Sequence, residues 1–296
     1  MNLPTTKQLR YFVALVDEGH FGRAATASFI SQSAFSTAIS ELETNLGTRL
    51  VDRTNRTVTI TATGQTIATQ ARLCLRDLEE LVETAQGQRE PLGGELRLGV
   101  IPTIAPFLLP KMLPKLRRSY PSLRLFLAED QTERLHTRLL QGELDVVLLA
   151  LPYELRSTEI LPLYKDRFSL ACRQNTKLID PLNYRYNRLD SGSVLLLEDG
   201  HCLRDHALDA CKIRSVEKLS RFAASSLLTL VEMVDADLGI TYLPEMAEGS
   251  ALIRNTRVRM YSLGDRSYRT IGLAWRKGSA RADEFKLLGD FLCSHR

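Results

Sequence analysis

The fold is decided by the stretch FGRAATASFISQSAFSTAISELETNLGTRLVDR, residues 21–53. It holds two helical patterns, a short one over 21–28 with a small alanine face and a longer one over 31–45. Ser31 stands where an N-cap is expected, and Gly47 follows the longer pattern as a C-terminal glycine does. Two short helices with a tight connection, the second beginning with small polar residues, are typical of a helix-turn-helix.

The segments on either side of this stretch extend the predicted module. Residues 6–18 predict an amphipathic helix, because apolar side chains recur there at three- and four-residue steps. Two β-rich runs flank Asn55-Arg56 and predict a small hairpin, or wing. Residues 61–86 predict a long helix whose apolar residues lie near heptad spacing, which favours a dimerising coil. A linker follows at 87–94, where Pro91 precedes Gly93-Gly94.

From Glu95 onward the pattern changes to alternating strands and helices. Near-continuous Val/Leu runs are typical of strands buried on both faces, so the sequence predicts a mostly parallel α/β sheet. A second α/β half begins with the strands at 168–172 and 194–197. The predicted strands before it lie at 96–101, 123–128 and 146–151, and the predicted helices at 106–120 and 132–141. A late strand is predicted at 270–275 and a closing helix at 284–292.

Composition places the chain among ordinary globular proteins. Its 296 residues, 44% apolar and 25% charged, predict two domains with room for a third small module. We predict boundaries at 1–62, 63–92 and 93–296. With no long apolar stretch and no signal-peptide pattern, we expect a cytoplasmic, nucleoid-associated protein without a membrane partner. Residues 1–90 hold nine basic and ten acidic residues, so bulk charge does not predict nucleic-acid binding and a motif must do so.

That motif is a specific one. The N-terminal segment resembles the winged helix-turn-helix of LysR-type regulators over about 60 residues without a gap. The residues that carry the resemblance are Phe21, Ala24-Ala25, Ile30 to Ser36, Ile39, Leu42-Glu43, Leu46-Gly47, Leu50 and Arg53. The sequence departs from the common pattern at Ser33 and Thr37, where the family usually has Pro and often has Arg. The resemblance implies a homo-oligomer that binds double-stranded promoter DNA. Its regulatory domain would have two α/β subdomains resembling periplasmic binding proteins, and RNA polymerase would be a further partner.

The expected DNA contacts follow from the same module. Gln can pair with adenine through two hydrogen bonds, and Ser can contact bases or phosphates. Basic residues on a wing would contact phosphates and fix the register of the protein on DNA. The candidate DNA-binding residues are Gln32, Ser33, Ser36, Thr37, Arg53 and Arg56.

A second informative stretch is LLLEDGHCLRD, residues 195–205, with Cys211 nine residues after Cys202. It is similar to the redox segment of the peroxide-sensing OxyR branch of the LysR family. The resemblance implies that Cys202 is the peroxidatic cysteine and Cys211 the resolving one, in a reversible disulfide that changes oligomer geometry and that cellular thiol reductants reset. The implied peroxide pocket consists of Thr103, Thr132, His201 and Arg269.

The residues themselves give a physical argument for this chemistry. A strand ending at Leu197, with Asp199 or Gly200 as cap, places Cys202 at a helix N-terminus, where the helix dipole favours a thiolate with a lowered pKa. Nine residues on one helix rise ~13.5 Å and place Cys202 and Cys211 on opposite faces. A disulfide needs Cα atoms within ~7 Å, so bonding would require the segment to refold.

Other functions stay open at this point. A LysR-type regulator could instead bind a small metabolite between the two α/β halves, with Cys202 as a lining residue. A thiol peroxidase would consume many equivalents of peroxide, but the winged helix argues against an enzyme, and the missing signal peptide argues against a periplasmic solute-binding protein. We predict no cofactor and no metal, since cysteine spacings typical of metal sites are absent. The other cysteines, Cys74, Cys172 and Cys293, are expected to be unreactive packing residues.

Overall fold

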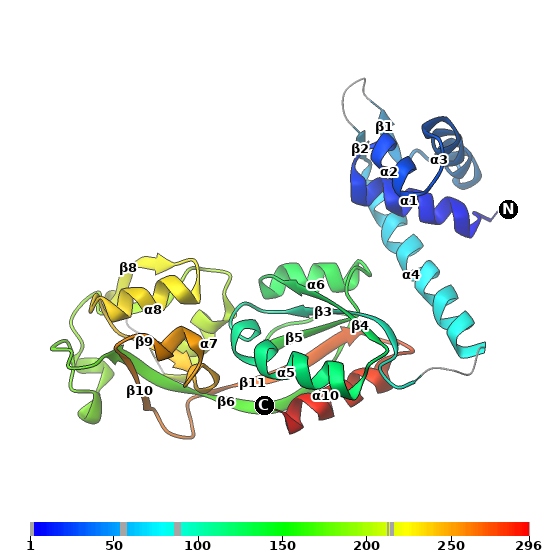
Figure 1. Ribbon diagram of the computed structural model, residues 1–296. Helices are drawn as coiled ribbons and strands as arrows, with labels where there is room; N and C mark the ends of the chain where they lie inside the picture. Colours follow the sequence, from blue (N-terminus) through cyan, green and yellow to red (C-terminus); the bar gives the residue numbers. More distant parts are fainter. Residues whose placement is uncertain (1–2, 54–57, 86–89, 212, 214–215, 296) are drawn as a thin grey trace. The chain divides into compact units, whose positions relative to one another are not determined.

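The computed structural model describes residues 3–53, 58–85, 90–211, 213 and 216–295. The chain divides into two compact units, Met1–Arg89 with Leu140–Glu143, and Glu90–Leu139 with Leu144–Arg296. We describe each unit by itself (Figure 1). None of the helices in the described ranges has the length and the hydropathy that crossing a bilayer would require.

The first unit is a helical module with a two-stranded hairpin. The side chains of Phe12, Leu15, Phe35, Ile39 and Leu42 are fully buried and form its core. The helices α1 and α3 therefore each bury one apolar stripe, as their spacing predicted. The elements are α1 (Thr6–Glu18), α2 (Phe21–Ala27), α3 (Gln32–Leu46), β1 (Val51–Arg53), β2 (Val58–Ile60) and α4 (Ala62–Ala85).

The ends of α3 are set by the two predicted caps. The Ser31 side chain accepts a hydrogen bond from the backbone N–H of Ala34 at 3.3 Å. Gly47 ends the helix with φ of +65°, a left-handed conformation that glycine adopts without steric cost. Both signals lie within a few residues of the helix, which is why the sequence was sufficient to predict this element.

The second unit is built on a mixed sheet in the strand order β10-β6-β11-β5-β3-β4, with β9 pairing β6. Strand β3 pairs in parallel with β4 and β5, whereas β11 runs antiparallel to both β5 and β6. The predicted mostly parallel sheet is therefore wrong, because β6, β9, β10 and β11 all pair antiparallel. The strands are β3 (Gly94–Val100), β4 (Leu123–Glu129), β5 (Val146–Leu151), β6 (Thr158–Arg173), β9 (Thr241–Pro244), β10 (Val258–Ser262) and β11 (Tyr268–Arg276).

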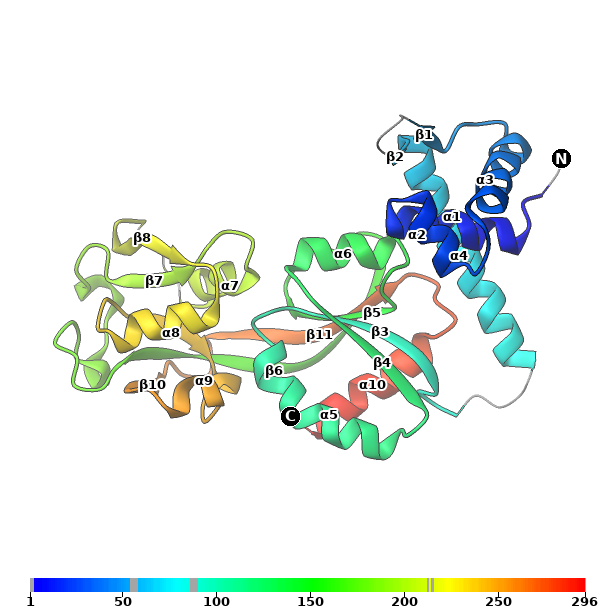
Figure 2. The same cartoon turned by 45° about the horizontal axis from the view of Figure 1, so that its top comes forward.

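Two lobes share this unit, and the long strands β6 and β11 run through both of them (Figures 1 and 2). In the first lobe α6 (Thr132–Leu140) lies on one side of the sheet, and α5 (Ala105–Ser119) and α10 (Ala282–Ser294) lie on the other. The second lobe adds a parallel strand pair and three helices, most of which the sequence had not predicted. These elements are β7 (Val194–Leu197), β8 (Leu219–Ala224), α7 (Cys202–Ala210), α8 (Leu227–Asp235) and α9 (Ala251–Arg254).

Each lobe has its own hydrophobic core. The core of the first lobe includes Val146 to Ala150, Ile271 and the tryptophan Trp275, whose ring lies 5.5 Å from that of Phe285. The core of the second lobe includes Val194 to Leu197 and Leu230. Ligand pockets occur preferentially where two separately packed cores meet.

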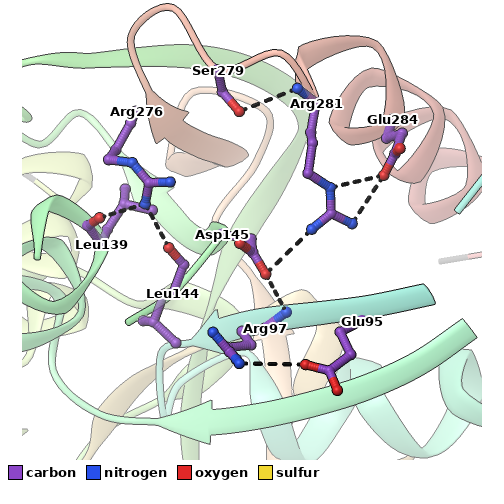
Figure 3. A network of polar contacts seen from close by, with 9 residues as sticks. All are labelled: Glu95, Arg97, Leu139, Leu144, Asp145, Arg276, Ser279, Arg281 and Glu284. Atoms are coloured by element: carbon purple, nitrogen blue, oxygen red, sulfur yellow. Dashed lines mark hydrogen bonds and ion pairs between the residues drawn. The ribbon is translucent and has the colours of Figure 1, made fainter. Parts of the chain in front are cut away.

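A polar network fixes the start of β5 in the first lobe (Figure 3). A carboxylate oxygen of buried Asp145 accepts a hydrogen bond from the backbone N–H of Arg97 at 2.7 Å and lies 3.5 Å from Nη1 of Arg281. Arg281 also pairs with Glu284 at 3.0 Å on α10. Arg276 at the end of β11 donates to the carbonyls of Leu139 and Leu144, both at 2.9 Å. The network therefore ties β3, β5, β11 and α10 together at the edge of the sheet where β5 begins.

Candidate redox site and DNA-contacting surface

The two candidate redox cysteines mark the two ends of α7. The helix begins at Cys202 and its C-cap is Cys211, and both thiols are free. The N-cap is His201, in an extended conformation and without a side-chain cap, so the expected capping by Asp199 or Gly200 is wrong by one or two residues. The intact helix holds the cysteines ~13.5 Å apart along its axis, so a bond between them would need α7 to unwind.

A glycine shapes the turn that leads into α7. Gly200 has φ of +95°, a region that side chains of L-residues rarely adopt. A Cβ at this position would lie 2.7 Å from Oε1 of Gln131, which directly precedes α6. The turn therefore approaches the first lobe closely at the residue before the N-cap.

Cys202 and Cys211 pack into different lobes. Cys202 is 7% exposed and belongs to the core of the first lobe, together with residues of β5 and β11. Cys211 is half-buried against the core of the second lobe, to which Leu203 and Ala207 of α7 also belong. The helix thus places its first residue at the boundary of the two cores.

Arg269 on β11 is a buried cation at the base of this site. It is 1% exposed, and its Nε donates to Oδ2 of Asp166 at 2.9 Å. Its Nη1 donates to the hydroxyl of Thr103 at 2.9 Å, and its Nη2 donates to the carbonyl of the same residue at 2.9 Å. Asp166 also accepts from the backbone N–H of Met246 at 3.2 Å. The guanidinium is therefore held by an acid on β6 and by a threonine in the turn between β3 and α5, and two of the predicted pocket residues are in contact.

Thr132, the first residue of α6, supplies a buried hydroxyl beside Cys202. It is 2% exposed, and its Oγ1 has no partner with regular hydrogen-bond geometry among the described residues. It lies close enough to the sulfur of Cys202 to lower the pKa of that thiol. A buried hydroxyl without a hydrogen bond of regular geometry is poorly satisfied, so this group is suited to an incoming polar molecule.

Burial controls the acidity of both thiols. Burial raises the pKa of Cys202, while the Arg269 guanidinium, the Thr132 hydroxyl and a backbone N–H oppose the shift and Asp205 adds to it. The expected lowering of the Cys202 pKa is therefore wrong in this conformation, because desolvation outweighs the helix N-terminus and the cation. Burial raises the pKa of Cys211 to about 12. Burial therefore favours the thiol form of both sulfurs in this conformation.

The remaining predicted pocket residue, His201, is 7% exposed and directly precedes Cys202. Sequence reasoning missed Asp166, Tyr153 and His206. Asp166 lies 103 residues from Arg269 in the sequence, and no local sequence pattern predicts such a distant ion pair. Tyr153 is near enough to Cys202 for the thiolate charge to contribute to its raised pKa, behind the larger effect of burial. No three His, Cys, Asp or Glu side chains of the described segments are arranged to hold a metal ion.

The candidate DNA contacts lie at the start of α3. Gln32, Ser33 and Thr37 are exposed, and Ser36 is half-buried. The hydroxyl of Ser33 bonds to that of Ser31 at 3.1 Å, and the hydroxyl of Thr37 donates to the Ser33 carbonyl at 3.1 Å. The Gln32 amide thus remains the side chain most available to read a base. Arg53 ends β1, but its side chain and the whole of Arg56 lie outside the described residues.

Comparisons with known proteins find relatives of both the N-terminal and the C-terminal parts of the chain. The LysR substrate binding domain matches residues 89–295, and the helix-turn-helix domain of bacterial regulatory proteins of the lysR family matches residues 6–65. The HTH-type transcriptional regulator EstR of Acinetobacter baylyi is 40% identical, over 98% of this chain and 96% of that protein. A hydrogen peroxide-inducible genes activator of Dickeya chrysanthemi is 37% identical, over 98% and 95%. A full-length OxyR variant from Pseudomonas aeruginosa superimposes with a TM-score of 0.78 at 31% identity, over 99% of both chains.

Proposed function

Because the chain belongs to the LysR family of bacterial transcriptional regulators, we propose that it senses hydrogen peroxide through a reversible Cys202–Cys211 disulfide. The disulfide would change the geometry of a homo-oligomer, a dimer of dimers, and thereby its binding to promoter DNA and its contact with RNA polymerase. The family is one of regulators and not of enzymes, so peroxide acts as a signal that each subunit consumes once per cycle.

One observation carries the proposal. The Cys202 thiol lies at the boundary of two cores, beside the buried Thr132 hydroxyl, which has no hydrogen bond of regular geometry among the described residues, and within the field of the buried Arg269 cation. A peroxide molecule that satisfies the hydroxyl would place an oxygen near the sulfur, and the cation would stabilise the thiolate and the charge developing on the leaving oxygen. Thr103, which fixes Arg269, and His201 complete the proposed pocket.

The chemistry consists of two balanced steps. The Cys202 thiolate attacks one peroxide oxygen, the O–O bond breaks, and the departing hydroxide takes a proton, which leaves a sulfenic acid and one water. The Cys211 thiol then attacks the sulfenic sulfur, an S–S bond forms, and a second water departs. Reduction by cellular dithiols returns both thiols and resets the protein.

The test is to add one equivalent of hydrogen peroxide to the reduced full-length protein and to map disulfides by non-reducing proteolysis and mass spectrometry. We expect a peptide that links Cys202 to Cys211, and a Cys211→Ser variant that stops at the sulfenic acid. A Cys293→Ser variant is the matched control, since Cys293 is exposed and outside the site. If both thiols stay free while the protein binds DNA, the proposal is wrong and a small metabolite between the lobes becomes the better hypothesis.

For DNA binding we predict that Gln32→Ala weakens operator binding about 5- to 150-fold, which corresponds to about 1–3 kcal/mol for a bidentate contact with a base. Binding to nonspecific DNA should change much less. The control is Arg49→Ala, an exposed arginine near the start of the hairpin, for which we expect similar losses on both DNAs. Fluorescence anisotropy at two salt concentrations measures both, and equal losses for Gln32→Ala would remove this residue from base recognition.

A further inference from the structure

A buried histidine on α7 is left unused by the mechanism above. His206 is 7% exposed, and its Nε2 lies 2.9 Å from the carbonyl oxygen of Pro152. Because a carbonyl can only accept, Nε2 carries the proton, and Nδ1 of the neutral ring is the acceptor. That Nδ1 is buried and has no hydrogen-bond partner among the described residues. The imidazole is therefore held by a single polar contact.

The position of His206 relates this contact to the redox cysteines. It lies four residues after Cys202, on the same face of α7, and five residues before Cys211. Pro152 follows β5, outside α7 and its neighbouring strand β7. The hydrogen bond therefore fastens the middle of α7 to a different part of the unit. The hydroxyl of Ser267 adds a second contact, at 3.0 Å, with the carbonyl of Ala210 at the end of the helix.

Any bond between the cysteines changes this part of the helix. His206 lies inside the loop that a Cys202–Cys211 disulfide would close, and the two sulfurs can meet only if α7 unwinds. Unwinding moves the peptide that carries His206 relative to Pro152, so the hydrogen bond cannot persist through the change. A contact present only in the reduced conformation lowers the rate at which α7 opens. It also shifts the equilibrium between the two conformations toward the reduced one.

We propose that His206 is a positioning residue for disulfide formation, which holds α7 closed through the Pro152 carbonyl and exchanges a proton with solvent when the helix opens. The inference rests on the proposed redox function of Cys202 and Cys211. Among the described residues the His206 ring makes no hydrogen bond to either sulfur, and it acts on the second step by controlling the approach of Cys211.

The proton exchange follows from the surroundings of the ring. Burial lowers the pKa of His206 in the reduced protein. Arg269 on β11 also lowers it, whereas the hydrogen bond to Pro152, Asp205 and Asp209 raise it. Tyr153 on the segment after β5 is the nearest titratable neighbour of Pro152 in the sequence, and β7 has only Val and Leu side chains. Once α7 opens, the imidazole enters water and its pKa returns toward about 6.5.

The sign of the pH effect can be derived from these two states. Reduction of the disulfide takes up two protons at the sulfurs, which stay protonated because the pKa values of both thiols are raised. Between the low pKa of His206 in the reduced form and about 6.5 in the oxidised form, reduction also releases one proton from the imidazole. Net uptake falls from two protons to one. In this pH range, a drop in pH therefore shifts the equilibrium toward the reduced form less steeply than the same drop does near neutral pH.

The decisive measurement is the reduction potential of the Cys202–Cys211 pair between pH 5 and 8, in dithiol redox buffers, with the linked peptide quantified by mass spectrometry. We expect a hundredfold change in the equilibrium constant per pH unit above pH 7, and a shallower change that approaches tenfold at lower pH. For a two-electron couple these changes correspond to about 59 and about 30 mV per pH unit. His206→Gln, which keeps an amide donor but does not titrate, should follow the steeper line throughout.

A matched control distinguishes His206 from the other histidines. His136 is exposed and bonds to the Arg156 carbonyl at 3.0 Å, so His136→Gln should keep the break in slope. A break that persists in His206→Gln, or a wild-type protein without any break, would overturn the proposal.

A kinetic experiment uses His206→Leu, which removes the N–H donor to the Pro152 carbonyl and keeps a side chain of similar volume. The measured quantity is the rate of disulfide formation. Loss of one hydrogen bond should speed disulfide formation about three- to tenfold, whereas sulfenic acid formation in a Cys211→Ser background should change less than about twofold. An unchanged second step would contradict the inference.

Failure of the redox function itself can be recognised separately. In the reduced protein, amide hydrogen exchange over Cys202–Ala210 should be about three- to tenfold faster in His206→Leu than in wild type, whether or not peroxide produces a disulfide. If the protein forms no disulfide but hydrogen exchange is faster in His206→Leu, the proposed redox function is wrong and the closing contact of His206 is supported. If the disulfide forms but hydrogen exchange is unchanged in His206→Leu, the redox function is supported and the closing contact is refuted.

Discussion

Arg269→Leu is expected to lower the free energy of unfolding of the reduced protein by about 3–5 kcal/mol, the range for breaking one partner out of a buried ion pair. The variant leaves the Asp166 carboxylate buried without its cation. It also removes the donors that satisfy the hydroxyl and the carbonyl of Thr103. Urea denaturation of the reduced protein, followed by circular dichroism, measures the change.

The same substitution should slow oxidation of Cys202 by peroxide at least about tenfold. Arg269 is the largest of the effects that oppose the burial-raised pKa of this thiol, so its loss raises the pKa further. Each unit of increase lowers the thiolate fraction tenfold at neutral pH. The rate is followed by trapping the sulfenic acid in a Cys211→Ser background, and oxidation at the wild-type rate would exclude Arg269 from the site.

A double variant separates stability from reactivity. Arg269→Leu combined with Asp166→Leu removes both charges, so it should be more stable than Arg269→Leu alone, by about 1–3 kcal/mol. The slow oxidation should remain, because the cation is still absent. If stability and the oxidation rate recovered together, Arg269 would act only through the fold.

Asp145→Ala should be the second most damaging change, with a loss of about 2–4 kcal/mol. The side chain is buried, and its removal leaves the backbone N–H of Arg97 unsatisfied and takes one of two carboxylates from Arg281 (Figure 3). The control is Asp283→Ala on α10, where an exposed ion pair with Lys286 is lost and the denaturation midpoint should not move. A similar midpoint for wild type and Asp145→Ala would show that the remaining pair with Glu284 is sufficient.

The parts of the fold that the sequence predicted are those encoded locally. The bounds of α1, α3 and α4 agree with the predicted helices to within a residue or two, because caps and apolar spacing act within one or two turns. Strand β6 was predicted only over 168–172, yet it begins at Thr158. Its first ten residues include Pro162 and charged side chains, and they are strand only because β11 pairs with them from about 110 residues away.

The candidate site divides in the same way. Resemblance to a family supplied Thr103, Thr132, His201 and Arg269, whereas the partner Asp166 was found only when β6 and β11 were seen side by side. The lowered pKa of Cys202 was predicted from the helix N-terminus and from the positive side chains expected near it. Its direction is set instead by desolvation in a core whose other members come from β5 and β11.

The fluorescence of the buried Trp275 indole reports on the folding of the first lobe. It is the single tryptophan of the chain, it lies 2% exposed in the core of the first lobe, and it sits on the strand that also carries Arg269. Its intrinsic emission should be blue-shifted in the native state and move to the red only when that core admits water. Because the second lobe and the helix-turn-helix hold no tryptophan, an emission curve that separates from the far-ultraviolet signal would reveal lobes that melt independently.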